Sequence, residues 1–470
     1  MKTVLNRRDL YLIERIMWKL VKPSELPASV SVESCSEGLT YTAFSNNAVL
    51  TITAPCDDDV KPSTLPWTII KEFAAKKNDY IDLDVNDEDV TLSWSVKGIS
   101  QTKTIVSLGS TDKLLPPLPE STTAHSFKLF DALLDAGRCV DADNKRYSLG
   151  GICFRGEKSQ ILSTDGRQAL IQDGFSFPFD DDVLCPVSKI FASKELREIG
   201  DSIEFGATDE WVYFKVANVD FWLRKVDGRF PKFDQFTENV DGHTWLHLDS
   251  TDTTFLAERL DALPGKDGKD DAVYIALNDG VAVCGHDTSM KTATELRLAN
   301  SHYEGSNVVT PLNRKFLKNV LNFGTNRIGF NPTDRTPLIC SGDDKLFIVM
   351  PLEGDEPVIA DDKLTVLMSN AETSVPSNID KPVKVSKPVP TTQACRAAKP
   401  RVKKATKSKG KINAKPNGKV VILDDALRLR NNLRDTLGSV NDLIRSLKSQ
   451  HRHDKCLRDA VASLRKFQNI

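Results

Sequence analysis

Hydrophobic and polar positions alternate along residues 1–352 in a pattern of short strands separated by helices. Apolar residues at steps of three and four predict helices over 6–21, 66–77, 125–138, 187–199, 250–263 and 311–322. Alternating segments predict strands at 37–54, 80–85, 90–96, 102–108, 146–155, 159–163, 168–173, 202–206, 211–216, 219–225, 272–277, 280–284, 326–330, 337–341 and 345–350. The pattern has no parallel β-α-β rhythm, so it indicates an α+β fold with antiparallel sheets.

One plan of helix and strands recurs three times, in units of about 115 residues. We place the units at 1–118, 119–236 and 237–352. An internal repeat of this kind predicts three α+β domains built alike, each with its own share of helix and sheet.

The pattern changes after residue 352. The segment 353–420 has almost no apolar periodicity, and its part from Lys381 to Lys419 is rich in Lys, Pro, Ala, Ser and Thr and includes KPRVKKATKSKGK. Low hydrophobicity and charge of one sign predict a disordered basic linker, either a solubilising spacer or a contact for phosphate groups. From 421 to 470 apolar residues return at helical spacing and predict two coiled-coil-like amphipathic helices, paired within one chain or between chains.

The net charge of −2 hides two opposite parts of the chain. Residues 381–470 carry 23 Lys and Arg against 6 Asp and Glu, whereas residues 1–380 carry 40 against 59. A basic tail on an acidic body is typical of proteins that contact nucleic acid.

Several classes of protein are disfavoured. No run of 18 apolar residues is present, so we expect no membrane contact. The nine cysteines are far apart without a C-x-x-C pair, which disfavours zinc and a disulfide framework and indicates a cytoplasmic protein. No nucleotide-loop, metalloprotease or hydrolase motif occurs, so we expect a non-enzyme with no cofactor and no metal. His451 and His453 lie without a third ligand nearby.

Three motifs resemble the bacterial DNA polymerase III beta subunit, the sliding clamp. They are Thr164-Asp165-Gly166 within RYSLGGICFRGEKSQILSTDGRQAL, Val226 to Pro231 (VDGRFP), and Val349-Met350-Pro351-Leu352. They stand in the family's order and spacing within 1–352, and the match is weakest in the first unit.

The resemblance implies a DNA clamp fold, in which helices inside and antiparallel sheets outside form a ring of two subunits around duplex DNA. It implies a nucleoid-associated homodimer that has a clamp loader among its partners and raises polymerase processivity without chemistry of its own. Basic residues on the helices would line the channel. The candidates are Arg7, Arg8, Lys22, Lys128, Arg138, Lys189, Lys194, Arg197, Arg314, Lys315 and Lys318. Arg146 and Tyr147 are further candidates, because they match a DNA-contacting segment of the family.

The resemblance also implies a hydrophobic cleft that binds short linear peptides of DNA polymerases and repair proteins. Its candidate lining is Leu149, Thr164, Gly166, Arg167, Ala169, Pro231, Phe236, Ile348, Val349, Met350 and Pro351. The chain departs from common family residues at Ser148, Arg167, Gln168, Gln235 and Phe236, and we expect its preferred peptide to differ from the family's usual one. Alternation along 345–350 predicts that about half of those side chains are core.

Ring closure requires a contact between the first and third units. The candidates are an edge strand near Ile105 and Leu108, and Leu263 after the helix at 250–263. The 118 residues after Leu352 start at the rim of the cleft, so they are candidates to cover it. The alternative function is a non-replicative clamp-fold structural or regulatory protein that binds DNA through its basic tail.

Overall fold

The computed structural model describes residues 2–56, 61–86, 89–106, 113–141, 148–231, 244–265, 269–287, 291–331, 336–354 and 363–369. The chain divides into two compact units, Met1–Ser377 and Asn378–Ile470. All described residues belong to the first unit. The predicted helices at 421–470, the basic stretch from 381 and the site candidates Leu108, Arg146, Tyr147 and Phe236 lie outside the described residues.

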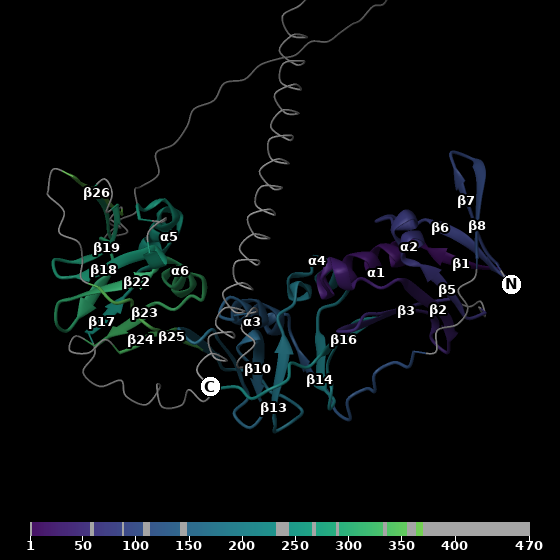
Figure 1. Ribbon diagram of the computed structural model, residues 1–470, viewed down its shortest axis with the longest axis horizontal. Coiled ribbons are helices and arrows are strands. Elements are labelled where there is room, and N and C mark those ends of the chain that lie inside the picture. Colours follow the sequence, from purple (N-terminus) through teal and green to yellow (C-terminus); the bar gives the residue numbers. More distant parts are fainter. Residues whose placement is uncertain are drawn as a thin grey trace, which may run out of the picture. The chain divides into compact units, whose positions relative to one another are not determined.

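Six copies of one element order, strand-helix-strand-strand-strand, follow one another in Met1–Ser377 (Figure 1). We call them modules one to six. Module one is β1 (Lys2–Asn6), α1 (Arg7–Leu20), β2 (Ser29–Cys35), β3 (Gly38–Phe44) and β4 (Ala48–Ala54); module two is β5 (Ser63–Pro66), α2 (Trp67–Phe73), β6 (Tyr80–Val85), β7 (Asp89–Val96) and β8 (Ile99–Val106). Module three is β9 (Thr123–His125), α3 (Lys128–Gly137), β10 (Gly151–Arg155), β11 (Gln160–Thr164) and β12 (Gln168–Gln172); module four is β13 (Asp182–Pro186), α4 (Lys194–Ile199), β14 (Ile203–Ala207), β15 (Trp211–Val216) and β16 (Val219–Arg224). Module five is β17 (Thr244–His247), α5 (Ser250–Arg259), β18 (Ala272–Leu277), β19 (Val281–Asp287) and β20 (Thr292–Arg297); module six is β22 (Val308–Asn313), α6 (Arg314–Asn322), β23 (Arg327–Phe330), β24 (Leu338–Ser341) and β25 (Lys345–Val349).

Two strands stand outside this order, β21 (His302–Glu304) and β26 (Leu364–Met368). Short 3₁₀ turns complete the chain at Pro23–Glu25, Ser148–Gly150, Lys189–Ala192, Leu260–Ala262 and Lys269–Asp271. The α+β class with antiparallel sheets is therefore confirmed. Each predicted unit of about 115 residues contains two modules. The sequence did not separate them, because the short strand before each helix gave no alternating signal.

Consecutive modules exchange their first strands. β1 pairs with β6 of module two, and β5 pairs with β2 of module one. The same exchange recurs at the later pairs, where β9 pairs with β14 and β22 with β18. Each resulting sheet has its three remaining strands from one module, in hairpin order.

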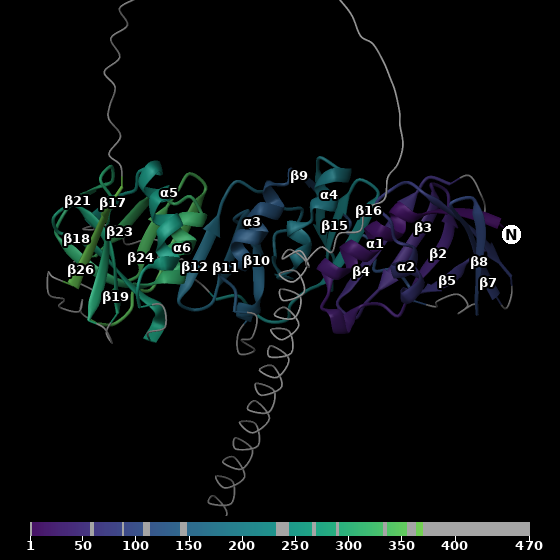
Figure 2. The same ribbon diagram turned by 90° about the horizontal axis from the view of Figure 1, so that it is seen from above.

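Sheets of neighbouring module pairs join edge to edge. β4 pairs antiparallel with β16, which makes the eight-stranded sheet β5-β2-β3-β4-β16-β15-β14-β9. β12 pairs antiparallel with β25, which makes the nine-stranded sheet β13-β10-β11-β12-β25-β24-β23-β17-β21. In both junctions the last strand of an odd module meets the last strand of an even module. Figure 2 labels both strands of the first junction, β4 and β16, in the same part of the molecule.

The helices lie on one side of the sheets and are built by ordinary capping and amphipathic rules (Figure 1). The Asn6 side chain accepts a hydrogen bond from the Arg8 amide and begins α1, whose apolar face from Leu10 to Leu20 is buried. Ser193 ends the 3₁₀ turn Lys189–Ala192 and caps α4, so the helix predicted over 187–199 is two short elements. Similarly, α6 begins at Arg314 because Asn313 caps it and residues 311–313 belong to β22.

Apolar side chains from the helices and the inner sheet faces form the core. One large cluster runs from Leu5 to Leu223 through modules one to four, and another covers modules five and six. Phenylalanines dominate the first cluster around Phe205, whose ring contacts those of Phe154 and Phe214 at centroid distances of 4.6 and 5.2 Å. The core therefore continues across the β4·β16 junction and gives the site a rigid support.

The strand β26 corrects one sequence prediction. Residues 353–420 were predicted to be a disordered linker, yet Leu364–Met368 pair in parallel with β20 at the edge of the sheet β22-β18-β19-β20-β26. The prediction is wrong for these five residues because the basic composition further along the segment hid the short apolar run LTVLM. This strand is not at the cleft that the extension was expected to cover.

Candidate DNA-binding surface and peptide pocket

Most predicted DNA-lining cations stand at the starts or ends of the helices and of the 3₁₀ turn before α4. Arg8, Lys22, Lys128, Arg138, Lys189, Lys194, Arg197, Lys315 and Lys318 are exposed, and Arg7 is half-buried. Four are held in ion pairs: Arg7 with Asp79, Arg138 with Asp135, Arg197 with Asp131 and Lys318 with Asp261. The remaining exposed cations make no ion pair with any described residue; they are Arg8, Lys22, Lys128, Lys189, Lys194 and Lys315.

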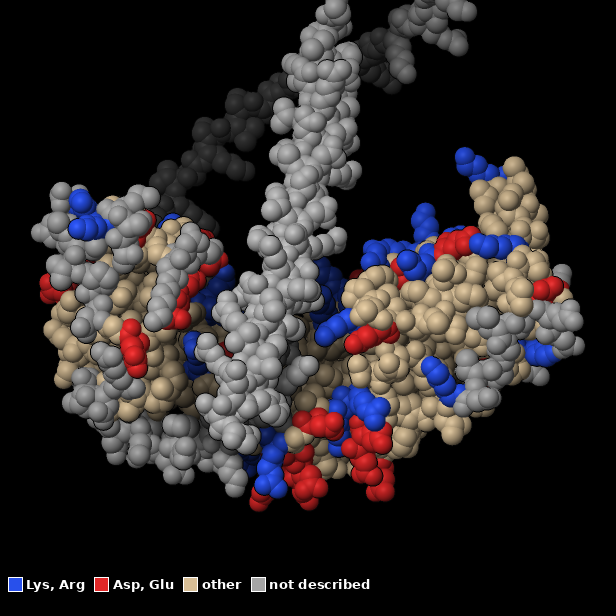
Figure 3. All heavy atoms as spheres, in the orientation of Figure 1, with Lys and Arg blue, Asp and Glu red and all other residues tan. Residues whose placement is uncertain are grey.

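These six unpaired cations lie at or just after α1, at α3, at the 3₁₀ turn and helix joined by Ser193, and at α6. Figure 3 shows Lys and Arg beside Asp and Glu both over α1 and α2 and on the surface below the strands β10, β13 and β14. An unpaired cation keeps its full charge for a phosphate group, and surface ion pairs with acids reduce that charge. The helical segments therefore present six cations whose charge is not offset by an ion pair with a described residue.

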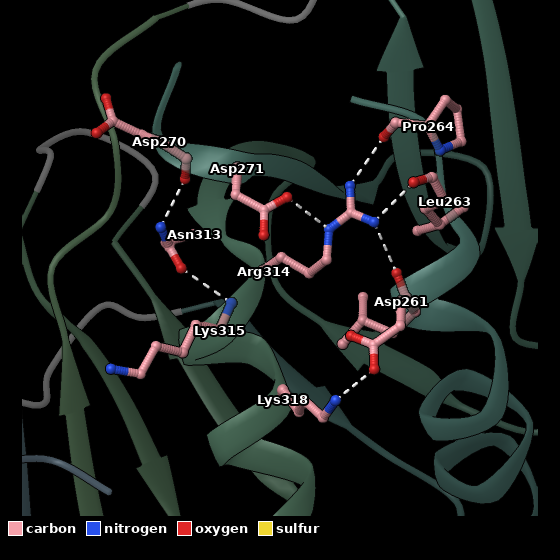
Figure 4. Close-up of polar contacts among 10 residues, drawn as sticks. Asp261, Leu263, Pro264, Asp270, Asp271, Asn313, Arg314, Lys315 and Lys318 are labelled. Carbon is pink, nitrogen blue, oxygen red and sulfur yellow. Dashed lines mark hydrogen bonds and ion pairs between the residues drawn. The ribbon is translucent and has the colours of Figure 1, made fainter. Parts of the chain in front are cut away.

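Arg314 is a correction, because the structure places it in the protein interior. Its side chain is 2% exposed, and its guanidinium donates to the backbone carbonyls of Leu260, Leu263 and Pro264 at 2.9, 2.7 and 2.8 Å (Figure 4). Asp271 forms an ion pair with it at 2.9 Å. Arg314 thus fastens the end of α5 to α6, and it is unavailable to DNA.

Lys315 and Lys318, the other two candidate cations on α6, are exposed, unlike Arg314. Figure 4 shows Lys318 turned to Asp261, while the Lys315 amine extends away from the cluster. Helical spacing explains the contrast, since residues 314 and 318 lie over α5 and residue 315 is turned by about 100°. Sequence periodicity alone had not separated these three cations.

A turn at Thr164-Asp165-Gly166 shapes the predicted cleft. The Thr164 hydroxyl donates to the Gln168 carbonyl at 2.6 Å, and Asp165 accepts from the amides of Arg167 and Gln168 at 2.9 and 3.0 Å. Gly166 has a φ of 89°, a conformation that strains residues with a Cβ. The three residues of the motif therefore form a self-contained turn between β11 and β12.

A pocket of about 70 Å³ opens beside this turn. Its lining comes from the turn, β12, the start of β24 and the end of β25, and consists of Thr164, Gly166, Arg167, Gln168, Ala169, Pro337, Ile348 and Met350. Six of these were candidates from the sequence. Gln168 and Pro337 were missed, the latter because no motif marks the residues before β24. The volume suits one apolar side chain, well below the 300–1,000 Å³ typical of sites for whole small molecules.

Strand alternation decides which residues of β25 face the pocket. Ile348 pairs in register with Ala169 and belongs to an apolar cluster on the pocket side of the sheet. Val349 is fully buried on the opposite face, within the core of modules five and six. The assignment of Val349 to the cleft lining is therefore wrong, as the period of two requires.

The VDGRFP segment supports the pocket from the side. Phe230 is buried in the same apolar cluster as Ala169 and Ile348, and Val226 packs against that cluster. The Val226 amide also donates to the Leu184 carbonyl at 3.0 Å. Leu149 is buried beside Gly166, whereas Pro231 and Pro351 are half-buried and outside the pocket lining.

Of the residues predicted to join two subunits, Leu263 lies in the core and Ile105 lies on an edge strand. Leu263 is 3% exposed within the core of modules five and six, so its assignment to an intersubunit surface is wrong. Ile105 is half-buried on β8, the last strand of the sheet β1-β6-β7-β8. In the described part of the chain β8 has a neighbour on one side only, which leaves its other edge open to a further strand.

One group of potential ligands was not expected. His247, His302 and Glu304 lie on β17 and β21 with their ligand atoms within 4.8 Å of one another. Arg327 is the register partner of His247 on the other side, and its guanidinium lies 3.9 Å from the Trp245 ring centre. The positive charge of Arg327 opposes a bound cation, so we assign no metal here.

Within the described residues, no helix has the length and the apolar character needed to cross a membrane.

Comparison with known proteins gives a likeness in structure. No protein-family profile matches the chain, and no curated protein matches its sequence. The DNA polymerase sliding clamp of Pseudomonas aeruginosa is 18% identical with a TM-score of 0.62, covering 75% of this chain and 99% of that one. The DNA polymerase III subunit beta of Borrelia burgdorferi is 14% identical with a TM-score of 0.62, covering 76% and 99%.

The DNA polymerase III beta chain of Streptococcus pneumoniae is 14% identical with a TM-score of 0.63, covering 75% of this chain and 100% of that one. Each of these clamps is matched over nearly its whole length, and about a quarter of this chain remains outside the match. At such low identity the likeness defines the fold. The chain therefore has the clamp fold of the bacterial DNA polymerase III beta subunits.

Proposed function

We propose that this protein is a DNA sliding clamp-like processivity factor, a homodimeric ring that encircles duplex DNA. The single observation that carries the proposal is the clamp fold, which matches 99% of the Pseudomonas aeruginosa sliding clamp. The six unpaired cations on the helix side support it, because a basic lining holds the phosphate backbone without reading sequence. The protein would act at the nucleoid as a non-catalytic tether, placed on DNA by a clamp loader.

The junctions between modules support a specific way of closing the ring. The last strand of an odd module pairs with the last strand of an even module at β4·β16 and at β12·β25. The two last strands left over are β20 of module five and β8 of module two. Pairing of β20 with β8 of a second copy would repeat the same junction twice and close a ring of two chains.

The test of the ring is topological. The protein is loaded on a nicked circular DNA by a clamp loader at moderate salt, and the circle is then cut once. We expect retention on the circle and loss from the linear DNA, since a ring leaves through an end. Equal retention on both forms would contradict encirclement and favour simple electrostatic binding.

We further propose that the pocket beside the Thr164-Asp165-Gly166 turn receives an apolar anchor of partner peptides, from DNA polymerases and repair proteins. Its apolar wall is Ala169 and Ile348, and the Met350 side chain at the rim is 41% exposed. Arg167 adds a positive group at the rim. This arrangement resembles a peptide groove with one apolar hole and a polar edge.

A matched pair of variants tests this pocket. Met350→Glu should weaken binding of a short fluorescent peptide ending in Leu-Phe at least tenfold. Val309→Glu is the control, because Val309 is 39% exposed on β22, away from the pocket. Equal binding by both variants would sink the proposal for this pocket.

A second candidate function is a clamp-fold structural or regulatory protein that binds DNA through its tail alone. The charge of 381–470, 23 Lys and Arg against 6 Asp and Glu, favours it. In that case the cut circle would retain as much protein as the intact one, and removal of the tail would abolish DNA binding.

A further inference from the structure

The strand β26 occupies the sheet edge that ring closure would use. β20 pairs with β19 on one side and with β26 on the other, so none of its edges is free in this chain. The register joins Glu295 to Val366 and Leu296 to Leu367. A strand of a second copy therefore cannot add to β20 while β26 is in place.

β26 differs from the partners at the two internal junctions. Both of those junctions are antiparallel, whereas β26 runs parallel to β20. At the internal junctions large apolar partners face each other in the interior, Leu50 with Phe221 and Leu170 with Phe347. In contrast, Leu367 opposite the buried Leu296 is 44% exposed. β26 thus satisfies the backbone of β20 but buries little apolar surface.

A small polar anchor holds the end of β26. The Ser369 amide donates to the Arg297 carbonyl at 2.9 Å, and the Ser369 hydroxyl accepts from the Ala299 amide at 2.8 Å. The same hydroxyl bonds to the buried carboxylate of Asp252. Burial alone would raise the pKa of Asp252, but hydrogen bonds from Ser369, Ser301 and Asn300 outweigh it and hold the pKa below its usual value. The anchor is therefore charged and intact at neutral pH.

The other strand of the proposed ring junction, β8, has an open edge in the described part of the chain. β8 carries apolar side chains in the open, with Ile99 64% and Val106 72% exposed. An exposed apolar edge strand is a site for adding a further strand, and soluble proteins normally protect it. The two-chain ring would cover β8 with β20, and β26 denies it that partner.

We propose that β26 is an intramolecular latch, which competes with β8 of a second copy for the edge of β20 and must leave before the ring can close. The proposal rests on the proposed ring, whose junction it makes switchable. The closed latch favours a single chain with an exposed β8 edge. Release of five residues and the Ser369 anchor makes β20 available for an antiparallel junction like the two inside the chain.

Two variants of the full chain test the latch. Val366→Pro with Leu367→Pro releases it. Alternate backbone amides of β26 point toward β20, so two adjacent prolines remove at least one N–H that bonds to β20. Thr294→Cys with Thr365→Cys locks it by a disulfide between register partners, in a background with Ser at Cys35, Cys395 and Cys456. The control for the first variant is Glu372→Pro with Thr373→Pro, beyond β26, and the control for the second is its reduced form.

Sedimentation velocity measures the association of each variant. We expect the released variant to dimerise at least tenfold more tightly than the parent and the proline control. The oxidised lock should remain at the mass of one chain, 52.1 kDa, and reduction should restore association. Unchanged association on release, or an oxidised lock that dimerises like its reduced form, would overturn the latch.

A crosslink identifies the surface that dimerises. A photoreactive residue at Val106 should join 292–297 of the second copy in the released variant, and a dimer without this crosslink would also overturn the latch. The circle assay separates the latch from the proposed function. If the released variant dimerises through β8 and β20 but is retained equally on circular and linear DNA, the ring function fails and the latch stands. If the oxidised lock is retained on circles, the latch fails and the ring stands.

Discussion

The side-chain amide of Asn319 donates a 3.0 Å hydrogen bond to the side-chain carbonyl of Gln168, and both side chains are buried. Asn319 lies on α6, and Gln168 begins β12 after the Thr164-Asp165-Gly166 turn. The Gln168 amide also donates to Asp165 at 2.8 Å. The bond therefore connects the helix side of the fold, where the unpaired cations stand, with the turn that shapes the pocket.

This pair predicts a measurable coupling. Gln168→Leu and Asn319→Leu should each lower the free energy of unfolding by about 1–3 kcal/mol, because each leaves a buried polar partner unsatisfied. The double variant should lose less than the sum of the two, by about 1 kcal/mol. Urea denaturation of the four proteins measures the cycle. Strict additivity would mean that the bond contributes nothing to stability.

Arg314 and Lys315 should separate stability from DNA binding. Arg314→Met removes the donor for three carbonyls and leaves Asp271 without its ion pair, so the free energy of unfolding should fall by about 3–5 kcal/mol. Lys315→Gln should change stability by less than about 0.5 kcal/mol. Arg314→Lys is the milder variant if Arg314→Met does not fold.

In the same experiment, Lys315→Gln should reduce the slope of log K against log salt for duplex DNA by about 0.9, the contribution of one phosphate contact. Arg314→Lys should leave that slope unchanged. A reversed outcome, with the slope lost in Arg314→Lys alone, would return Arg314 to the DNA surface.

Asp9 should make stability depend on pH. Burial raises the pKa of Asp9 from 3.8 to about 6, and the charge of Arg8 lowers it only in part. Because the folded protein holds this proton more tightly than the unfolded chain, Asp9 costs stability as pH rises from about 4 to about 6, and the full cost remains above pH 6. The pH slope of the unfolding free energy between these values measures this cost.

Asp9→Asn should therefore raise the free energy of unfolding at pH 7 by about 1–3 kcal/mol and change little at pH 3.5. Asp201→Asn, at an exposed acid, is the control. A loss of stability at pH 7 would show that the favourable place of Asp9 in the first turn of α1 outweighs its burial.

The basic tail should dominate weak DNA binding. Removal of 381–470 takes away 23 Lys and Arg. We expect the salt dependence of DNA affinity to become much shallower, since counterion release scales with the number of phosphate contacts. Binding curves at several salt concentrations measure it, and an unchanged slope would exclude the tail from DNA contact.

Much of the fold could be predicted from the sequence because amphipathic helices and alternating strands are local patterns. The turn at Thr164-Asp165-Gly166 and the apolar wall at Ala169 and Ile348 were found through sequence motifs. The residues of these motifs interact mainly with their own turn or with the neighbouring strand. The fold class and the clamp likeness followed from the same segments.

The rest depends on contacts that no local pattern carries. Arg314 reads as a surface cation at the start of an amphipathic helix, and only the carbonyls of Leu260, Leu263 and Pro264 make it interior. Leu263 likewise became core through packing of distant strands. β26 was missed because its short run of four apolar residues and one threonine pairs with β20, about seventy positions earlier in the chain.

The exchange of first strands between modules has a consequence for folding. β1 completes the sheet of module two, and β5 completes that of module one. Neither module can close its sheet without its neighbour, so each pair should unfold as one cooperative block, with amide protons of both modules exchanging together. The smallest fragment of this chain expected to fold by itself is then a pair of modules. Cutting the chain inside a pair should unfold both of its modules.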